Sequence, residues 1–227
     1  MKKYSTVLLD ADDTIFDFTA CEGEALRLAF DKYGFQLNEN IRKAYTMINK
    51  DLWEQFEKGL IDKATVINRR FRILFDRFEI KGNKDGFEEV YQEFMGMQHI
   101  FIDGAEQIIE YLYKRYDLYI VTNGVTKTQR RRIRESGIEP FIRRIFVSEE
   151  AGYQKPMKEY FDYCFERIEN ANRDETIIIG DSLSSDIKGG NNAGITTCWF
   201  NPKSLINTTD SKVDIEIKSL DELYEIL

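Results

Sequence analysis

Short apolar runs alternate with longer helical patterns over most of the chain. The runs lie within Val7–Leu9, Leu118–Gly124, Arg144–Gly152, Thr176–Ser182 and Ile195–Phe200. Short continuous apolar runs are typical of parallel strands that are buried on both faces. Apolar residues at helical spacing lie between them: Ile108, Ile109 and Leu112, and later Phe161, Phe165 and Ile168. This alternation, with an edge strand expected in 213–217, predicts a doubly wound α/β domain around a mostly parallel sheet.

The segment 19–97 has a different pattern. It contains none of the three prolines, and its apolar residues recur at helical spacing. The stripes are Leu26, Phe30 and Tyr33; Ile41, Tyr45, Ile48, Leu52 and Phe56; Ile67, Phe71, Leu74 and Phe78; and Phe87, Val90, Tyr91 and Phe94. They predict an all-helical insertion of about four helices, whose stripes form a hydrophobic core rather than a cofactor site. Residues 1–18 and 98–227 then form the α/β core domain.

Composition and charge exclude several classes of protein. The chain has 227 residues, 42% of them hydrophobic and 32% charged, as in a soluble globular protein. A net charge of −8 disfavours binding to a nucleic-acid backbone. No apolar run is long enough to span a bilayer, and aspartates interrupt the N-terminal run too early for a signal peptide. We therefore expect a cytoplasmic protein with no nucleic-acid or membrane partner.

Three cysteines and one histidine limit the candidate chemistry further. Cys21, Cys164 and Cys198 are odd in number and far apart, so we expect buried free thiols rather than disulfides or a zinc site. His99 is the only histidine, which excludes mechanisms that need two. Carboxylates are therefore the expected acid–base groups.

Polar residues end three of the apolar runs. Asp10 and Asp12 follow the first run, Thr122 and Asn123 end the second, and Asp181 follows the fourth. In an open α/β sheet, ligands bind beyond the carboxyl ends of the strands, where these residues converge. Asp10 and Asp12 are two positions apart, so in an extended chain their side chains point to the same side.

Crowded carboxylates at one sheet edge indicate a metal site. Two carboxylates about 4 Å apart repel each other by roughly 4 kcal/mol at an effective dielectric of ~20. Magnesium prefers oxygen ligands and is commonly held by carboxylates together with a substrate phosphate. Asp10, Asp12, Asp181 and Asp186 are the candidate ligands, whereas Asp13, Asp17 and Asp103 are assigned to helix caps and turns. Lys155, a loop residue before Pro156 and a helix, is the candidate cation for a phosphate.

Four motifs, in this order and spacing, resemble those of the haloacid dehalogenase-like superfamily of phosphohydrolases. They are D-A-D-D-T at Asp10–Thr14, V-T-N-G at Val121–Gly124, Lys155 in Y-Q-K-P, and G-D-S-L-S-S-D at Gly180–Asp186, before a glycine-rich helix. The resemblance covers the whole core domain. It implies a Rossmann-like core with the helical insertion, 19–97, as the family's mobile cap.

The resemblance implies a role for each polar group in phosphoryl transfer. Asp10 is expected to attack phosphorus as the nucleophile and to form an aspartyl-phosphate. Asp12 is expected to protonate the leaving oxygen and then to accept a proton from the hydrolytic water. Thr122 and the backbone amide of Asn123 are expected to bind phosphoryl oxygens. Lys155 is expected to neutralise charge on the nucleophile and the phosphate.

The resemblance also implies Mg²⁺ as the cofactor. Its expected ligands are the side chains of Asp10 and Asp181 and the backbone carbonyl of Asp12. Asp186 is expected to act on the metal through a water molecule or to hold Lys155.

Two details are similar to one branch of the superfamily. The second aspartate of the first motif, Asp12, suits the family's phosphatases rather than its dehalogenases. Asp13 in place of the common glycine, T-I-F-D-F after it and T-N-G-V-T-K-T-Q later are similar to the pyrimidine 5′-nucleotidases. The resemblance therefore implies a small-molecule phosphomonoester, a pyrimidine nucleoside monophosphate, as the substrate. We expect a monomer or a weak homodimer.

Other functions stay open at this point. A sugar-phosphate phosphatase or a phosphomutase of the same superfamily shares the aspartyl-phosphate. The mutase differs in that a sugar hydroxyl, not water, attacks it. A receiver-like phospho-accepting module also combines an acidic Mg²⁺ pocket with a lysine. The helical insertion and the lack of an aspartate after Leu118–Val121 disfavour it.

One basic run stands out in an acidic chain. Thr128–Gly137 contains four arginines, Arg130, Arg131, Arg132 and Arg134. We expect the run to lie on the solvated face of the helix that follows V-T-N-G, with substrate steering as the alternative.

Overall fold

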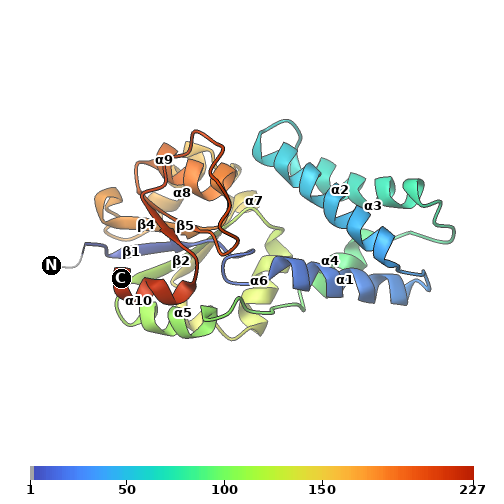
Figure 1. Cartoon of the computed structure of the whole chain (residues 1–227), viewed down its shortest axis with the longest axis horizontal. Coiled ribbons are helices and arrows are strands. Elements are labelled where there is room, and N and C mark those ends of the chain that lie inside the picture. The colour runs from blue at the N-terminus through green and yellow to red at the C-terminus, as the bar shows by residue number, and fades with distance from the viewer. Residues whose placement is uncertain (1–2) are drawn as a thin grey trace. The chain divides into compact units, whose positions relative to one another are not determined.

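The computed structural model describes residues 3–227, which divide into two compact units (Figure 1). The first unit contains the described residues up to Phe18 together with His99–Leu227, and the second unit is Thr19–Gln98. The first expected boundary, after residue 18, is the same, and the second lies one residue away from the expected one. Each unit has a hydrophobic core of its own.

Secondary structure follows the expected alternation. The strands are β1 (Thr6–Leu9), β2 (Asp117–Thr122), β3 (Arg144–Val147), β4 (Thr176–Gly180), β5 (Thr196–Phe200) and β6 (Ile215–Ile217). The helices between and after them are α5 (Ala105–Tyr113), α6 (Thr126–Glu135), α7 (Ser148–Ala151), α8 (Lys158–Phe165), α9 (Lys188–Ala193) and α10 (Leu223–Ile226). Short helical turns are η1 (Glu139–Phe141), η2 (Arg173–Glu175), η3 (Leu183–Ile187) and η4 (Leu220–Glu222). The insertion contains α1 (Phe18–Lys32), α2 (Glu39–Glu57), α3 (Lys63–Arg77) and α4 (Phe87–Met95).

Within residues 3–227 the six strands form one sheet in the order β3-β2-β1-β4-β5-β6. Every neighbouring pair is parallel, so the sheet is wholly parallel where the sequence predicted a mostly parallel one. β1 lies at the centre, where Leu9 is paired with Ile120 on one side and with Ile179 on the other. The strand order reverses between β1 and β4, and in doubly wound sheets ligands bind at this switch point.

Successive residues of the central strand pack on opposite faces of the sheet. Val7 and Leu9 belong to a core cluster with residues of α5 and α10, whereas Leu8 packs with residues of α8. Helices α5 and α10 cover one face and α8 and α9 the other (Figure 1). Burial on both faces explains why the strands are continuous apolar runs. The predicted doubly wound, Rossmann-like fold is confirmed.

Every regular element of the insertion is a helix with one buried face, and two of these helices begin at a capping side chain. Asn38 accepts a hydrogen bond from the N–H of Ile41 at the start of α2, and Asp62 accepts one from Thr65 at the start of α3. The predicted stripes pack against each other: the ring of Tyr45 stacks on that of Phe71 at 4.9 Å. Most of the stripe residues are buried, as expected of a core, whereas Tyr33, Ile48, Ile67, Phe78, Val90 and Phe94 are half-buried.

A chain of polar contacts joins all four helices of the insertion, and the sequence did not predict it. Asn49 of α2 donates to Glu22 of α1 at 2.7 Å. Arg70 of α3 donates to Asn49 at 3.1 Å and to Glu88 of α4 at 2.9 Å. Glu22, Asn49 and Arg70 are buried, so these bonds satisfy groups that would be costly to leave unpaired.

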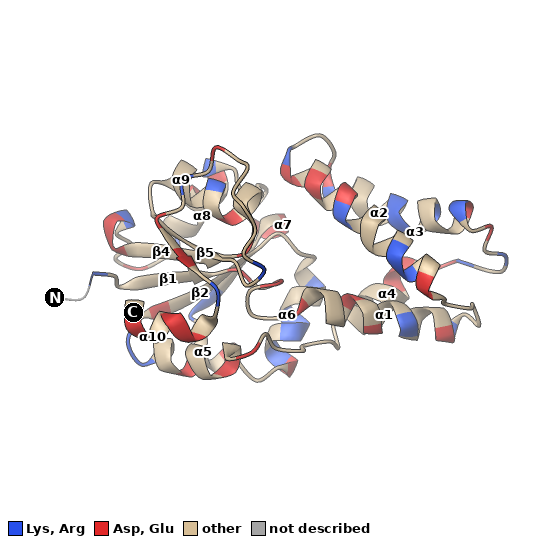
Figure 2. Ribbon diagram, in the orientation of Figure 1, with Lys and Arg blue, Asp and Glu red and all other residues tan. Residues whose placement is uncertain are grey.

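The surface and the cysteines agree with the expectations from composition. Acidic and basic residues are interspersed along α2 and α3 (Figure 2). The three cysteines are free and buried, as expected. Within the described part of the chain, every helix is too short or too polar to cross a lipid bilayer.

Candidate active site

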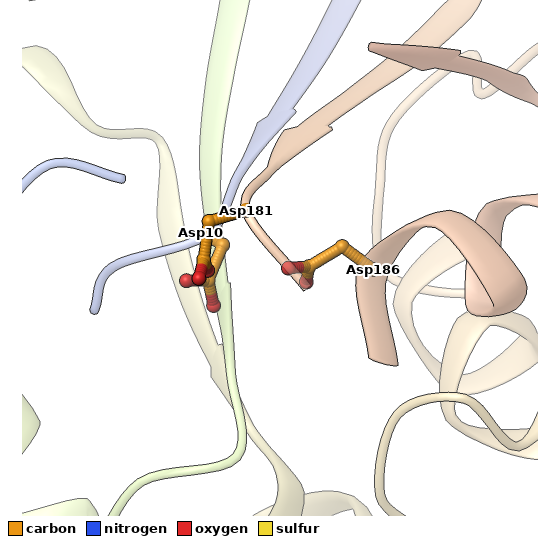
Figure 3. A group of neighbouring side chains, drawn as sticks. All are labelled: Asp10, Asp181 and Asp186. Carbon is orange, nitrogen blue, oxygen red and sulfur yellow. The ribbon is translucent and has the colours of Figure 1, made fainter. Parts of the chain in front are cut away.

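Three carboxyl groups meet beyond the carboxyl ends of β1 and β4. Asp10 follows β1 and Asp181 follows β4. The N–H of Asp10 donates a hydrogen bond to the carbonyl of Ile179, so the two segments stay paired at the ends of these strands. One oxygen each of Asp10, Asp181 and Asp186 lies within 4.8 Å of the others. Figure 3 shows Asp10 and Asp181 pointing the same way, with Asp186 facing them. The switch point thus brings together three of the predicted metal ligands.

Asp186 reaches this group because a tight turn and a glycine make room for it. It lies on η3, a π-helical turn of a kind frequent at functional sites. The N–H of Ser182 donates to Asp186 Oδ2 at 3.1 Å. A Cβ atom on Gly180 would lie 2.3 Å from Asp186 Cγ, so only glycine leaves space for this carboxylate.

Lys155 lies between two of these carboxylates and is itself buried. Its Nζ donates to Asp10 at 2.5 Å, to Asp186 at 2.6 Å and to the carbonyl of Val121 at 2.9 Å. These three acceptors use all three hydrogens of the ammonium group. The contact with Asp186 is one of the two roles expected for that residue.

Asn123 positions Lys155 through the backbone. Its side-chain oxygen accepts from the N–H of Lys155 at 2.9 Å, and its side-chain nitrogen donates to the Lys155 carbonyl at 3.0 Å. The sequence suggested only a backbone role for Asn123. Thr122 is buried at the end of β2, where its hydroxyl accepts from the N–H of Gly124 at 3.0 Å.

Burial and mutual repulsion dominate the electrostatics of the site. Burial raises the pKa of Asp10 well above the ordinary range, against the opposing effect of Lys155. Burial, then the charges of Asp10 and Asp186, raise the pKa of Asp181 in the same way. For Lys155, burial lowers the pKa, but the two neighbouring carboxylates outweigh it and the net shift is upward. Lys155 therefore carries its positive charge in the folded protein.

The residues present fit a divalent cation. When ionised, three carboxylates and one ammonium leave two negative charges, −3 + 1 = −2, which a divalent cation balances. The donors that the group offers are all carboxylate oxygens, which hard cations such as Mg²⁺ prefer. The side chain of Asp12 lies outside this group, so any contact of Asp12 with the metal is left to its backbone carbonyl.

The side chain of Asp12 instead contacts α6. It accepts hydrogen bonds from Gln129 and Arg132. Arg132 is fully buried, so the expectation that the basic run lies on a solvated face is wrong for this residue. It holds for the exposed Arg130 and Arg134. Ile133 is the signal that could have indicated the burial of Arg132. Positions 129, 132 and 133 have the i, i+3, i+4 spacing of one helix face, and the apolar residue at 133 indicates that this face is buried.

The family of the chain follows from this geometry together with its sequence. The sequence profile of haloacid dehalogenase-like hydrolases matches residues 7–200. The chain belongs to that family. The match includes all four motifs and the whole insertion, so the resemblance recognised in the sequence is confirmed.

Relatives of this haloacid dehalogenase-like hydrolase match it from end to end. The HAD-hydrolase YfnB of Bacillus subtilis is 47% identical, covering 100% of this chain and 97% of that protein. A crystal structure of YfnB bound to magnesium, described as revealing interdomain movement, has a TM-score of 0.94, covering 100% of this chain and 99% of that one. The pyrimidine 5′-nucleotidases PynA of Streptococcus pneumoniae and YjjG of Escherichia coli are 35% and 29% identical. Both alignments cover 99% of this chain and at least 95% of the relative.

Proposed function

We propose that this hydrolase is a Mg²⁺-dependent phosphomonoesterase that acts through an aspartyl-phosphate on Asp10. The observation that supports this most is the group of Asp10, Asp181 and Asp186, with Lys155 bridging two of them. Asp10 directly follows the central strand β1, and its carboxyl group contacts the buried ammonium of Lys155, as that of Asp186 also does. The contact with Lys155 fixes the Asp10 carboxyl group and favours the ionised form that a nucleophile needs, while burial opposes ionisation.

The reaction proceeds in two steps. A carboxylate oxygen of Asp10 bonds to phosphorus while the ester P–O bond breaks, and the leaving oxygen takes a proton from Asp12. Water then attacks phosphorus, gives a proton to Asp12, and releases phosphate with Asp10 restored. Thr122 and Asn123 lie at the neighbouring strand end to orient the phosphoryl oxygens, and Lys155 neutralises charge on Asp10.

Magnesium would be held by Asp10 and Asp181, with the backbone carbonyl of Asp12 and with Asp186 through water. When bound, it neutralises negative charge shared by the nucleophile and the phosphoryl group. Magnesium in the YfnB structure supports this assignment.

We infer that the substrate is a nucleoside 5′-monophosphate, with pyrimidine nucleotides preferred. The 35% identity to PynA over nearly the whole chain supports this choice. The family match over residues 7–200 also favours a turnover enzyme over a receiver-like module. The buried free thiols fit a cytoplasmic enzyme, and light scattering can test the expected monomer or weak homodimer.

A phosphate-release screen tests this proposal. The purified protein is assayed against nucleoside and sugar monophosphates with Mg²⁺ and with excess chelator, beside Asp10→Asn and the control Asp103→Asn, an exposed aspartate outside the site. We expect pyrimidine monophosphates to be hydrolysed fastest, chelator to abolish turnover, and Asp10→Asn to lower kcat by about a thousandfold or more. Asp103→Asn should match the wild type.

Different results would contradict the substrate, the reaction type and the metal requirement. Preference for sugar phosphates would overturn the nucleotide assignment. Turnover that needs a sugar bisphosphate activator would indicate a phosphomutase. Hydrolysis that persists in excess chelator would exclude the magnesium site.

A further inference from the structure

Two side chains of α6 bond both carboxylate oxygens of Asp12. Gln129 Nε2 donates to Asp12 Oδ2 at 2.5 Å, and Arg132 Nη1 donates to Asp12 Oδ1. The same Arg132 nitrogen lies 3.3 Å from Gln129 Oε1, so the two donors are also joined to each other. Each oxygen of Asp12 therefore has a separate partner on one rigid element.

Burial distinguishes this contact from an ordinary surface ion pair. Gln129 is 2% exposed and Arg132 is 0% exposed, whereas the side chain of Asp12 is 27% exposed. The two donors are thus closed off behind Asp12, and only the carboxylate is accessible. A surface pair contributes little because water competes for both groups, but water cannot reach this guanidinium.

Arg132 also packs against the turn that follows Asp12. Its guanidinium lies 4.7 Å from the ring centroid of Phe16. The N–H of Asp13 donates to the Phe16 carbonyl at 2.8 Å, which closes the turn directly after Asp12. Arg132 therefore contacts both the side chain of Asp12 and the residue that closes the turn after it.

A glycine next to the predicted phosphate-binding residues makes room for this arrangement. A Cβ atom on Gly124 would lie 2.3 Å from Gln129 Nε2 and 2.7 Å from its Cγ. Gly124 directly follows Thr122 and Asn123. The approach of Gln129 to Asp12 thus depends on the same segment that ends β2.

We propose that Gln129 and Arg132 are positioning residues that set the direction of the Asp12 carboxyl group for proton transfer to the leaving oxygen. This inference rests on the proposed function. A general acid must lie within hydrogen-bond reach of the atom that it protonates, and small errors in position are costly. Asp12 lies beyond the end of β1, and its side chain, 27% exposed, would be free to rotate without these contacts. Two donors on one helix remove that freedom.

The test uses two esters that differ in their need for an acid. Alkyl phosphates, including nucleoside monophosphates, release a basic alkoxide that must be protonated, whereas p-nitrophenyl phosphate releases a stable phenolate. We expect Arg132→Met and Gln129→Met to lower kcat/KM on the alkyl ester by about tenfold to a hundredfold. On p-nitrophenyl phosphate the change should stay within about threefold. The matched control is Arg130→Met on the same helix, because Arg130 is exposed and pairs with Glu150.

A second comparison tests whether the two residues act through Asp12. In an Asp12→Asn background, Arg132→Met should cause no further loss on the alkyl ester, because the group that it positions no longer transfers a proton. Equal losses on both esters, or a further loss in that background, would contradict the inference and indicate a purely structural role. Thermal unfolding shows which variants fold. If Arg132→Met does not fold, Gln129→Met and Arg132→Lys are compared on the two esters in its place. A wild-type protein that hydrolyses neither ester contradicts the proposed function itself.

Discussion

Asp10 is a buried carboxyl group that contacts one ammonium group and lies close to two further carboxyl groups. Lys155 Nζ is 2.5 Å from it, and oxygens of Asp181 and Asp186 lie within 4.8 Å. Burial raises its pKa, yet a nucleophile must be ionised. One lysine does not offset three carboxylates, so full ionisation of the group requires a further cation.

Magnesium affinity should therefore increase with pH. A carboxyl group whose pKa is raised by folding holds its proton longer in the folded state, as Asp10 and Asp181 do. Without metal, folding stability then falls as pH rises from the ordinary aspartate range through the raised values. Metal binding needs the carboxylates, so it releases protons and becomes tighter over the same range.

Calorimetric titration with Mg²⁺ at about pH 5 and about pH 7.5 measures this directly, since unperturbed aspartates are ionised at both. We expect tighter binding at the higher pH and little binding by Asp181→Asn at either. Equal affinity at the two pH values would contradict the account of the cluster.

Lys155 offsets the repulsion between the carboxylates of Asp10 and Asp186, so replacing it with methionine should destabilise the protein. Lys155→Met leaves Asp10 and Asp186 without their buried cation, and loss of one partner of a buried pair costs about 3–5 kcal/mol. We expect urea unfolding in chelator to show a loss of this size. Adding Asp186→Asn should restore part of the stability but not the activity. A double variant as unstable as Lys155→Met would show that repulsion is not the cause.

At the scale of elements, two strand ends depend on glycines that admit a side chain from the element that follows. Gly180 leaves room for Asp186 of η3, and Gly124 leaves room for Gln129 of α6. In both places a methyl group would overlap the incoming side chain. The glycine at each strand end and the polar side chain that packs against it therefore depend on each other.

Gly180→Ala should displace Asp186 from Lys155. We expect kcat/KM to fall by about tenfold or more, because a misplaced charged group weakens phosphoryl transfer strongly. The stability cost should fall but not vanish when Asp186→Ala is added, since the overlap with the carboxyl group is removed while the Cβ atom of residue 186 stays 2.6 Å away. Unfolding curves of the two single variants and the double variant test this, and additive losses would place the strain elsewhere.

The sequence predicted the elements well because their burial is simple. Strands buried on both faces are continuous apolar runs, and each helix of the insertion has one apolar stripe. Asp10 and Asp181 could be predicted to meet because parallel strands end at one edge. Their contacts with Lys155 and Asp186 needed the loop conformations, which depend on tertiary packing.

Buried charges were the features that the pattern did not reveal. Arg132 lies among exposed arginines of α6, and Arg70 lies among exposed arginines of α3. Each is buried because a carboxylate from another segment meets it, Asp12 in one case and Glu88 in the other. A pattern of local hydrophobicity does not contain such distant partners.

At the scale of the whole molecule, an acidic protein is proposed to bind an anionic ester. The net charge is −8, and charges of both signs are spread over the ribbon in Figure 2. Long-range attraction therefore does not explain binding. Lys155, a bound cation and backbone groups at the strand ends must supply the positive potential locally, where burial strengthens their effect. The fold contributes by placing these groups at one switch point.

The most direct test of the central claim is to look for phosphate on Asp10 during turnover. The protein is mixed rapidly with Mg²⁺ and a phosphomonoester whose phosphoryl group carries an isotopic label. The reaction is quenched in acid, and the labelled peptide is identified by mass spectrometry. The account predicts a base-labile phosphate on the peptide that contains Asp10, present with Mg²⁺ and absent with chelator. Turnover without any phosphorylated protein, or a label on another residue, would contradict it.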